Sequence, residues 1–425
     1  MADFVQHLLP RHIIPVINQL SLDAPVVVME GPRSVGKSAI LAQLAHQRNV
    51  AVLDLDDLAT RNAVKADPDL AVAGVGPVCI DEYQKVPAVP DVIKAELNRG
   101  ASPGRFFLTG SARHDALPRS SQALTGRMAR CAIYPLSQGE IHGVEENFVA
   151  RAIFNPSSLA STHVSTTTRS EYAQRVFTGG FPLALRSSTD QARRTWFDNY
   201  LKLSLERDVL ELSNLRQLDK LGGLMRRLVG QTGQLLNISG AGAPLELTKP
   251  TAESYVVLLE KLFLVYRLEA WGKTLYTRAL KTPKVHVFDS GVGARLLRLT
   301  PNKIVAQNPT ALSEYGHLLE SFAVSELLKQ ASWSGVVADV GHFRTKDNEE
   351  VDLVLESDQG DVVGVEVKAG RSVNETDLAG LRQLKKVVGS NFLGGIILNT
   401  GPRSYALEPQ MYAVPLDRLW QRVGE

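Results

Sequence analysis

The chain has 425 residues, of which 44% are hydrophobic and 22% charged. These proportions are typical of a folded globular protein, and at roughly 100–200 residues per domain the length predicts several domains. Lys and Arg number 47 against 45 Asp and Glu, a net charge of +2, which excludes a global basic field, so any contact with nucleic acid must come from local patches. The two cysteines, Cys79 and Cys131, have no CxxC partner, which argues against a disulfide framework or a zinc site and favours a reducing compartment.

The N-terminal residues 1–20 lack the basic start and long apolar core of a signal peptide. The most apolar stretch of the chain, YVVLLEKLFLVYRLEAW, is interrupted by Glu260, Lys261 and Arg267, whereas a membrane span needs about 20 apolar residues. We therefore expect a cytoplasmic protein without membrane contact.

Residues 1–150 alternate short apolar runs with amphipathic segments. The runs lie at 25–31, 49–57, 76–82 and 105–111, and each ends in polar residues. Near-continuous apolar strands that alternate with helices predict an α/β fold with a parallel sheet covered on both faces. Ligands of such sheets bind at the carboxyl ends of the strands, which is where these polar residues lie.

The first of these runs leads into GPRSVGKS, which matches the phosphate-binding pattern GxxxxGK[ST] in full between an apolar strand and an amphipathic helix. The glycines let backbone N–H groups wrap the phosphates, and the helix N-terminus adds its positive end. We expect Lys37 to reach the β- and γ-phosphates and the Ser38 hydroxyl to ligate Mg²⁺. The expected phosphate-binding residues are Gly31, Pro32, Arg33, Ser34, Val35, Gly36, Lys37 and Ser38.

Two further strand ends support this nucleotide site. Asp81 and Glu82 end one run; a strand-end aspartate can hold Mg²⁺, and the adjacent glutamate can orient the attacking water. Thr109 and Ser111 end another run and are candidates for sensing the γ-phosphate. Three elements in this order predict a Mg-ATP site, and no NKxD-type sequence that would read guanine is visible.

Arginines near the predicted site are candidates for stabilising the transition state. Arg127, in LTGRMAR, is the main one, and Arg113 is another. Where such a residue operates it contributes about 10³–10⁵ in rate. The alternative is an arginine unrelated to phosphate. The sequence does not assign either residue to its own chain or to a neighbouring copy, so a homo-oligomer is a candidate state.

The middle of the chain has a different composition. Residues 151–170 include NPSSLASTHVSTTTRS, which is rich in Ser and Thr and has little apolar periodicity, so we expect a linker or an exposed loop. Residues 171–235 place apolar residues at helical spacing. Residues 236–290 read as two helices followed by strands, which indicates a winged helix-turn-helix.

Basic residues near this segment are able to contact phosphates of DNA or RNA, which gives affinity without sequence readout. The alternative is a module that packs against protein and carries a solvated charged face, because helix 251–265 has few polar residues able to read bases. The basic residues are Lys249, Arg267, Lys273, Arg278, Lys281 and Lys284.

Residues 301–425 read as a small α/β module that begins with an amphipathic helix. Asp352 starts one strand, and Glu366 and Lys368 face the same side of the next strand because their positions alternate. Carboxylates and a lysine on adjacent strands indicate metal-assisted phosphodiester cleavage, with Mg²⁺ on Asp352, Glu366 and, from the helix, Glu320. Lys368 would position the nucleophile. The alternative is a solvated charged hairpin, since such short fragments are common.

Taken in order, the motifs resemble those of bacterial and archaeal AAA+-type ATPases that carry a C-terminal DUF4143 domain. The N-terminal motifs are GPRSVGKS, VCIDEYQKVP, FFLTGSARHD and LTGRMARCAIYPLSQGE, and later ones include FTGGFPLAL, KVHVFDSGVGARLL, EVDLVLE and VEVKAG. Nearly the whole chain is covered, apart from 155–170. The resemblance implies a P-loop ATPase core at 1–150, a helical lid with a winged-helix region at 171–300, and a restriction-endonuclease-like PD-(D/E)xK nuclease fold at 301–425.

The resemblance also implies roles for single residues. Asp81 and Glu82 match the second ATPase motif, and Ser111 lies in the sensor segment. Ser38 stands where threonine is usual in the family, and it keeps the hydroxyl. The residues that match the nuclease core and its helix acid are Asp352, Glu366, Lys368 and Glu320.

These observations lead to two expected functions. In the first, ATP hydrolysis gates a metal-dependent nuclease-like module that acts on DNA or RNA. In the second, the chain is a nucleotide-switched binding or regulatory protein, such as a defence or toxin–antitoxin component. Its C-terminal module then binds nucleic acid or a protein partner and cuts nothing.

Overall fold

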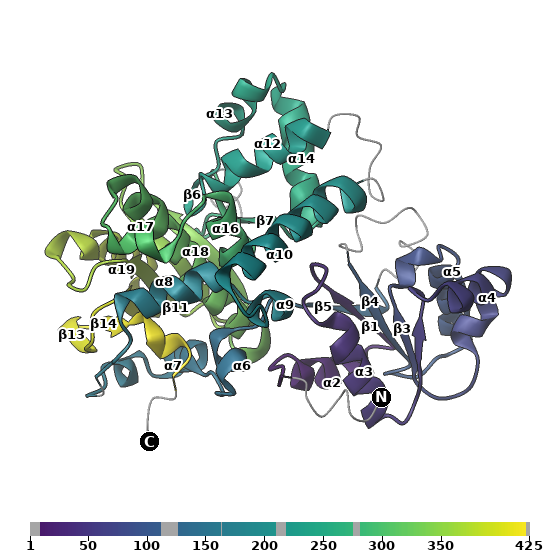
Figure 1. The fold of residues 1–425 in the computed structure, drawn as a ribbon. Helices are drawn as coiled ribbons and strands as arrows, with labels where there is room; N and C mark the ends of the chain where they lie inside the picture. Colours follow the sequence, from purple (N-terminus) through teal and green to yellow (C-terminus); the bar gives the residue numbers. More distant parts are fainter. Residues whose placement is uncertain (1–8, 112–125, 163, 210–217, 275–280, 422–425) are drawn as a thin grey trace. The chain divides into compact units, whose positions relative to one another are not determined.

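The chain folds into two compact units. The computed structural model describes residues 9–111, 126–162, 164–209, 218–274 and 281–421 (Figure 1). Arg113 and Arg278 lie outside the described residues. Unit 1 comprises residues 1–136, 208–214 and 261–263, and unit 2 comprises residues 137–207, 215–260 and 264–425.

Unit 1 is built on a five-stranded parallel sheet with the strand order β2-β3-β4-β1-β5. Every residue of β1 and β4 is buried, as expected for strands covered on both faces. The predicted α/β fold with a parallel sheet is confirmed. All carboxyl ends therefore lie at one edge of the sheet. The strands are β1 (Val26–Glu30), β2 (Val52–Asp54), β3 (Val78–Asp81), β4 (Phe106–Gly110) and β5 (Met128–Ala132).

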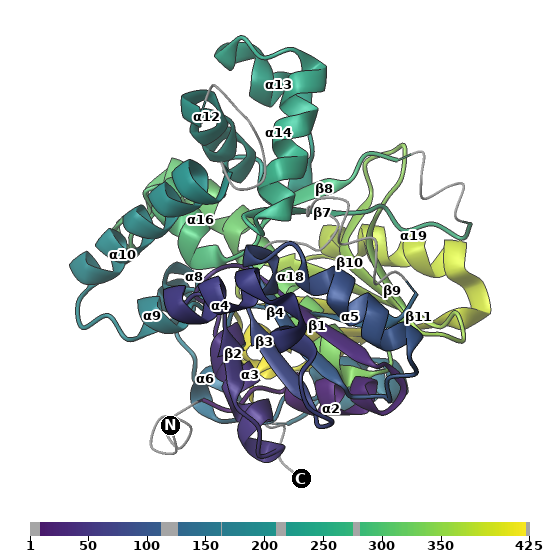
Figure 2. The same ribbon diagram turned by 90° about the vertical axis from the view of Figure 1, so that its right-hand side faces the viewer.

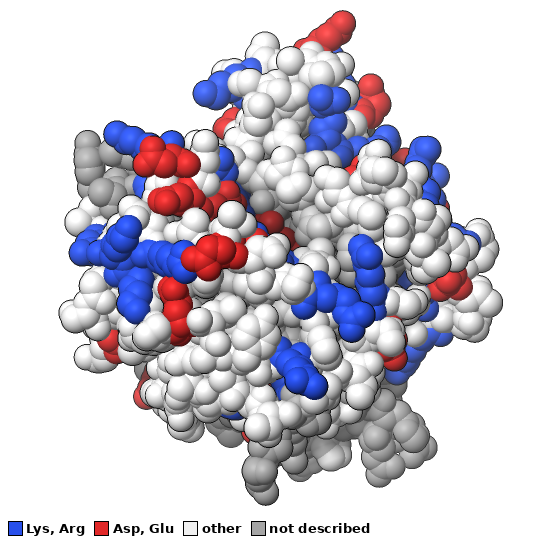
Figure 3. Space-filling view, turned by 90° about the vertical axis from the view of Figure 1, so that its left-hand side faces the viewer, with Lys and Arg blue, Asp and Glu red and all other residues white. Residues whose placement is uncertain are grey.

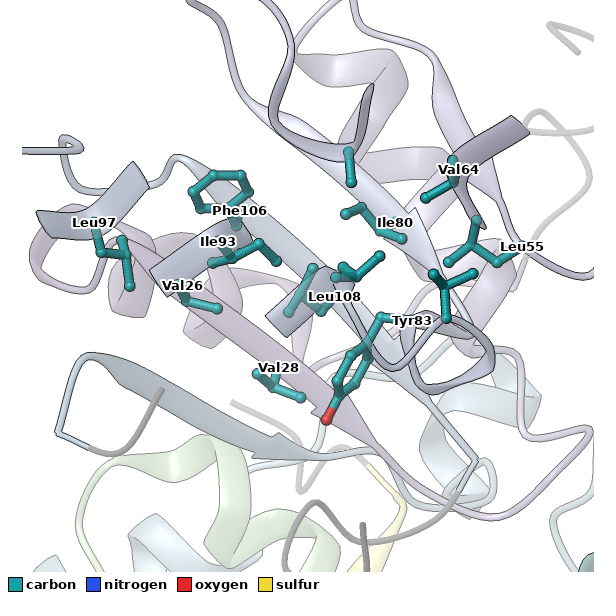
Figure 4. Packing of buried hydrophobic residues seen from close by; sticks show 13 residues of the cluster. Val26, Val28, Leu55, Val64, Ile80, Tyr83, Ile93, Leu97, Phe106 and Leu108 are labelled. Carbon is teal, nitrogen blue, oxygen red and sulfur yellow. The ribbon is translucent and has the colours of Figure 1, made fainter. Parts of the chain in front are cut away.

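Helices cover both faces of this sheet, with α4 and α5 on one side and α2 and α3 on the other (Figure 1). Val26 and Val28 lie on the same face of β1 because side chains alternate along a strand. There they pack with Ile80 of β3 and Ile93 of α5 (Figure 4). The helices are α2 (Ile14–Asp23), α3 (Lys37–Gln47), α4 (Leu58–Ala66) and α5 (Val89–Asn98).

The C-terminal part of unit 2 is a six-stranded sheet with the order β13-β14-β12-β11-β10-β9. β9, β10 and β11 pair antiparallel, and β11, β12 and β14 pair parallel. Leu381 and Leu384 of α19 (Ala379–Val388) pack on Val351 and Val354 of β10. The strands are β9 (Asp339–Arg344), β10 (Glu350–Glu356), β11 (Val362–Lys368), β12 (Phe392–Asn399), β13 (Tyr405–Glu408) and β14 (Met411–Pro415).

A second, three-stranded antiparallel sheet of unit 2 has the order β6-β8-β7. An isolated bridge between Ala270 and His342 joins the chain after β7 to β9 of the larger sheet, and Figure 2 shows β7 and β8 beside β9 and β10. The two sheets are therefore neighbours. The elements in chain order are α12 (Leu218–Val229), β6 (Gln234–Leu235), α13 (Ile238–Gly242), α14 (Lys249–Lys261), β7 (Val265–Leu268) and β8 (Lys284–Val287).

The segment 151–170, predicted to be a linker or an exposed loop, is helical in part and anchored in part. The hydroxyls of Ser165 and Thr167 both donate to the carboxylate of the buried Asp417. The backbone N–H of Ser165 also donates to Pro402 O over 2.7 Å. The Ser and Thr residues here satisfy a buried carboxylate, which composition could not show. The helical elements of this stretch are α7 (Phe148–Phe154) and η5 (Pro156–Leu159).

The end of the first domain also differs from the expected residue 150. Unit 2 begins at residue 137, because the N-terminus of α6 is held by a buried side chain of the long helix α18. The Gln138 N–H donates to Glu326 of α18 over 2.8 Å. The helices of this part are α6 (Gln138–His142), α8 (Arg169–Thr178), α9 (Pro182–Leu185), α10 (Asp190–Leu203), α16 (Ser290–Leu296), α17 (Pro301–Val305) and α18 (Pro309–Ser334).

A buried aspartate joins two of the motifs that resemble the family. Asp289 caps α16 by accepting from Gly291 N at 2.9 Å and Val292 N at 3.1 Å, and its other oxygen accepts from Gly180 N at 2.8 Å. The carboxylate of Asp289 therefore joins the motifs FDSGVG and FTGGFP by hydrogen bonds. Within the described part of the chain, no helix has the length and apolar character required to cross a bilayer.

Candidate functional site

The phosphate-binding pattern forms the loop between β1 and α3. A Cβ on Gly31 would lie 2.3 Å from the carbonyl oxygen of Ile133, so only glycine fits there. Gly36 has φ +97°, a left-handed conformation that glycine adopts without strain. These two positions let the loop curl tightly, so that α3 begins at Lys37 with its N-terminal N–H groups at the loop. The structure places all eight predicted residues, 31–38, in this loop and the first turn of α3.

Lys37 folds back over the loop that precedes it. Its Nζ donates to the carbonyl oxygens of Gly31 at 2.9 Å and Pro32 at 2.8 Å, and the residue is only 5% exposed. Ser38, by contrast, is exposed. The loop therefore presents an ammonium group and a hydroxyl at the start of a helix, where the helix dipole favours an anion.

An arginine that the sequence analysis did not single out holds this loop. Arg11 donates from Nη1 to Val35 O at 2.9 Å and from Nη2 to Tyr134 O at 2.7 Å. It thereby joins the phosphate-binding loop to the segment after β5. The loop pattern itself carries no signal for an arginine upstream of the strand.

The predicted acidic and hydroxyl residues meet at the carboxyl ends of β3 and β4. Thr109 Oγ1 donates to Asp81 Oδ1 and accepts from the Glu82 N–H at 3.1 Å. The side-chain amide of Gln84 donates to Glu82 Oε2 and to Ser111 Oγ, the latter at 3.1 Å. One hydrogen-bonded network thus contains all four predicted residues. Gln84 is the member that the sequence analysis missed.

The oxygen atoms at this edge fit a magnesium ion carried by a nucleotide. Ser38 offers a hydroxyl, and Asp81, at the end of β3, offers a carboxylate. Mg²⁺ is usually held in such sites by one or two protein oxygens together with phosphates and waters. These two residues are therefore the ones that would hold it.

Arg127 lies at the opposite edge of the same sheet. It precedes Met128, which pairs with the first residue of β1, whereas the phosphate-binding loop follows the last residue of β1. At about 3.3 Å per residue, the five residues of β1 span roughly 16 Å. The exposed Arg127 donates instead to Asn98 at the end of α5. Of the two alternatives left open for Arg127, this position disfavours a contact with a nucleotide bound to its own chain.

A second group of charged residues lies in unit 2, and we call it the acidic cluster: Glu320, Glu350, Asp352 and Glu366. Asp352 of β10 and Glu366 of β11 are buried, and so is Glu320 of α18. Glu366 Oε1 accepts from Lys368 Nζ at 2.8 Å, and Asp352 Oδ2 accepts from Val367 N at 2.9 Å. The predicted residues of the C-terminal module therefore do lie together.

Lys284 of β8 lies within this cluster with its side chain 0% exposed. Its Nζ is 2.8 Å from Glu320 Oε1 and 2.8 Å from Asp352 Oδ1, and it also pairs with Glu350. The sequence analysis placed Lys284 among residues able to contact phosphate, and that was wrong because the residue is buried. Burial alone would lower the pKa of Lys284, but the carboxylates of Asp352, Glu320 and Glu350 raise it well above its ordinary value.

The same burial acts on the carboxylates. Burial, and then the Asp352 charge, raise the pKa of Glu366 to about 8. The same two causes raise the pKa of Glu320 well above its ordinary value. Over the ranges that the structure describes, no group of three or more His, Cys, Asp or Glu side chains is arranged to hold a metal ion. Two of the predicted metal ligands, Glu320 and Asp352, bind the ammonium group of Lys284, and the third, Glu366, binds that of Lys368.

The other basic residues of the predicted winged helix are also partly engaged. Arg267 pairs with Glu260 at 2.8 Å and with Glu253 at 2.9 Å, both on α14. Lys281 donates to Arg344 O at 3.2 Å. On the face drawn in Figure 3, Lys and Arg side chains alternate with Asp and Glu and form no broad single-sign area among the described residues. Among the described residues of that set, Lys249, Lys273 and Lys281 are exposed.

Three family models match successive parts of the chain. The AAA domain matches residues 23–142, a domain of unknown function (DUF8612) matches 169–303, and a domain of unknown function (DUF4143) matches 315–419. The chain therefore contains an AAA domain and a C-terminal DUF4143 domain. The AAA domain contains the phosphate-binding loop and the network around Asp81, and the DUF4143 domain contains the acidic cluster without its lysine, which lies in the DUF8612 region.

Two relatives are similar in sequence over most of this chain. Uncharacterized proteins Rv2008c of Mycobacterium tuberculosis and Mb2031c of Mycobacterium bovis are each 24% identical over 398 residues, which is 93% of this chain and 81% of theirs. Among solved structures, the Walker-type ATPase PABY2304 of Pyrococcus abyssi covers 69% of this chain and 97% of its own, at 14% identity and a TM-score of 0.43. AMPPCP-bound DnaA from Aquifex aeolicus covers 60% of this chain and 90% of its own, at 12% identity and a TM-score of 0.29.

Proposed function

We propose that Mg-ATP binds at the carboxyl ends of β1, β3 and β4 and is hydrolysed there. The backbone N–H groups of the phosphate-binding loop would hold the phosphates, and Lys37 would exchange its carbonyl partners for the β- and γ-phosphate oxygens. Ser38 and Asp81 would hold Mg²⁺, which neutralises charge on the phosphates when bound. The observation that supports this most is the network of Asp81, Thr109, Glu82, Gln84 and Ser111 at the same sheet edge as the loop.

Glu82 is the residue we propose to orient the attacking water. The carboxylate already accepts from Gln84, whose amide also contacts Ser111. Gln84 is therefore a positioning residue that ties the proposed water-orienting carboxylate to the proposed sensor. When the γ-phosphate leaves, a movement of Ser111 would change the position of the Glu82 carboxylate, because the Gln84 amide binds both residues.

The test separates binding from hydrolysis. Lys37→Ala should lose hydrolysis by about 10²–10³-fold or more, because a charge that stabilises the transition state is removed. Glu82→Gln should keep nucleotide affinity and lose turnover. The measurements are phosphate release and binding of a fluorescent ATP analogue, both with Mg²⁺. Unchanged turnover in Lys37→Ala would contradict the proposal that ATP is hydrolysed at this site.

For the DUF4143 domain we propose the second expected role, in which the module binds a nucleic acid or protein partner in response to ATP and does not cut. The specific observation in favour of this role is that two of the carboxylates expected to act in cleavage, Glu320 and Asp352, are buried around Lys284. The first role, a nuclease gated by ATP, needs those carboxylates to be accessible to metal and substrate.

A cleavage assay distinguishes the two roles. Purified full-length protein is incubated with Mg²⁺ or Mn²⁺, with and without ATP, on plasmid, linear and single-stranded DNA and on RNA. We expect no cleavage above that of Asp352→Asn. Cleavage that is lost in both Asp352→Asn and Glu366→Gln would establish the nuclease role instead.

A second copy of the chain is a further proposed partner. Because Arg127 lies away from its own phosphate-binding loop, an arginine that acts at the phosphates would have to come from another element or another copy. Measuring the mass in solution with and without a non-hydrolysable ATP analogue tests this. A mass that stays monomeric with the analogue would exclude it.

A further inference from the structure

We propose that Lys284 is the resident cation of the acidic cluster: its ammonium takes the position that a divalent metal would take in a nuclease, so the DUF4143 domain holds no Mg²⁺ there. This goes beyond the proposed function, and it bears on that function only by giving a physical reason why the module does not cut. It does not depend on ATP hydrolysis.

The coordination of Lys284 is complete. An ammonium group has three N–H donors, and three carboxylates surround this one, from Glu320, Glu350 and Asp352. They come from α18 and β10, whereas the lysine comes from β8. A cation supplied by one element is therefore enclosed by anions from two others, as a metal would be.

The remaining oxygens of the cluster leave little for a second cation. One carboxylate oxygen of Asp352 accepts a hydrogen bond from Lys284 Nζ, and the other accepts one from the Val367 N–H. Glu366 gives one oxygen to Lys368, and its other oxygen, Oε2, is buried without a hydrogen-bond partner among the described residues. A divalent ion at that oxygen would lie near two ammonium groups, those of Lys368 and Lys284, both of which act electrostatically on Glu366. Like charges at such range repel, so the residues present do not fit a metal.

The three-stranded sheet that carries Lys284 is held against the acidic cluster by further contacts. Further buried contacts join the three-stranded sheet and its flanks to the elements of the cluster: His286 Nδ1 lies 2.9 Å from Ser321 Oγ on α18, and His342 Nε2 lies 3.1 Å from Thr282 O. Trp271 Nε1 donates to Glu356 Oε2 at 2.7 Å. Withdrawing Lys284 would therefore require β8 to separate from α18 and β9, and Asp352 is buried while β8 stays in place.

The test is Mn²⁺ binding to the full chain without nucleotide, followed by electron paramagnetic resonance and calorimetry. Wild type and Asp352→Asn should give the same Mn²⁺ titration, because wild type has no metal on Asp352. Lys284→Met should gain one Mn²⁺ per chain, and Lys284→Met/Asp352→Asn should lose it again. Lys281→Met is the matched control, since it removes an exposed lysine from the same segment.

Thermal unfolding gives a second readout. Mn²⁺ should raise the unfolding temperature of Lys284→Met and leave wild type, Lys281→Met and Lys284→Arg unchanged. The inference is overturned if wild type binds Mn²⁺ at a site that Asp352→Asn removes, or if folded Lys284→Met gains no site. Should Lys284→Met not fold, the comparison of wild type with Asp352→Asn still decides. A failed ATPase assay leaves this result standing, because no nucleotide is present.

Discussion

Unit 1 and unit 2 each contain a buried lysine, Lys37 and Lys284, and the hydrogen-bond partners of these two lysines differ. Lys37 donates to carbonyl oxygens of its own loop, which a phosphate oxygen can replace with a stronger, charge-assisted hydrogen bond. Lys284 is bound by three carboxylates and is fully buried. A motif of lysine and carboxylates therefore indicates a ligand site only where the partners of the lysine can be exchanged.

The largest expected effect is on stability, and it tests the account of Lys284 as a buried cation bound by carboxylates. Lys284→Met should lower the free energy of unfolding of unit 2 by about 3–5 kcal/mol, because it leaves buried carboxylates without their cation. All four tryptophans, Trp196, Trp271, Trp333 and Trp420, lie in unit 2, so urea unfolding followed by tryptophan fluorescence reports on unit 2.

The control for that measurement is Lys281→Met, which should stay within about 1 kcal/mol of wild type because one hydrogen bond to a carbonyl is lost. Equal stability of Lys284→Met and Lys281→Met would contradict the account of Lys284 as a buried counter-ion.

Next in size is a substitution in the phosphate-binding loop. Gly31→Ala should weaken ATP binding by about 10²-fold, because the new Cβ would lie 2.3 Å from the Ile133 carbonyl oxygen and must displace the loop. Gly76→Ala is the matched control, since nothing lies within 4 Å of its added Cβ. Titration with a fluorescent ATP analogue measures both. Wild-type affinity in Gly31→Ala would show that the loop is not closely packed against β5.

The pH dependence of stability should sharpen the comparison further. Burial and the Asp352 charge raise the pKa of Glu366 from 4.5 to about 8. A carboxyl whose folded-state pKa is raised contributes stability that is fully present below 4.5 and is lost as pH rises through about 8. Unit 2 should therefore become less stable from pH 5 to pH 8.5, and Glu366→Gln should reduce this slope.

The readout is the urea midpoint of tryptophan fluorescence at each pH. Glu326, whose pKa burial raises to about 7, contributes to the slope in both proteins, so the difference between wild type and Glu366→Gln isolates Glu366. Parallel slopes for the two proteins would mean that Glu366 does not hold its proton in the folded state.

The smallest expected effect concerns Gln84. Gln84→Ala should lower kcat for ATP by about 10-fold and leave nucleotide affinity unchanged, because the amide positions Glu82 and contacts no phosphate in our proposal. Gln47→Ala, at the exposed end of α3, is the control. Phosphate release at saturating ATP measures the effect, and an equal loss in Gln47→Ala would argue against a specific role.

Much of the AAA domain follows from local sequence. The loop at 31–38 could be predicted as a phosphate-binding turn because its glycines, lysine and hydroxyl stand in a fixed order next to a buried strand. Asp81 and Ser111 could be placed beside it because parallel strands bring their carboxyl ends to one edge. What local sequence predicts well are groups whose positions depend on the sheet alone.

The wrong predictions share a different cause. Lys284 looked like a surface lysine because its partners, Glu320 and Asp352, are 36 and 68 residues away in the chain. Ser165 looked like part of a linker because Asp417 is 252 residues away. Arg127 could not be placed from sequence because strand order, which brings β5 next to β1, decides which edge of the sheet it occupies. No local pattern carries these long-range pairings.

The bonds from Ser165 and Thr167 to Asp417 also bear on the order in which the chain is made. The sheet of unit 1 is complete in sequence by Ala132, so it can form early in synthesis. The segment at 164–168 has to wait for Asp417, near the end of the chain. Domains fold as units during synthesis. The ATPase sheet would therefore already be formed on the ribosome while this segment of unit 2 still lacks its anchor.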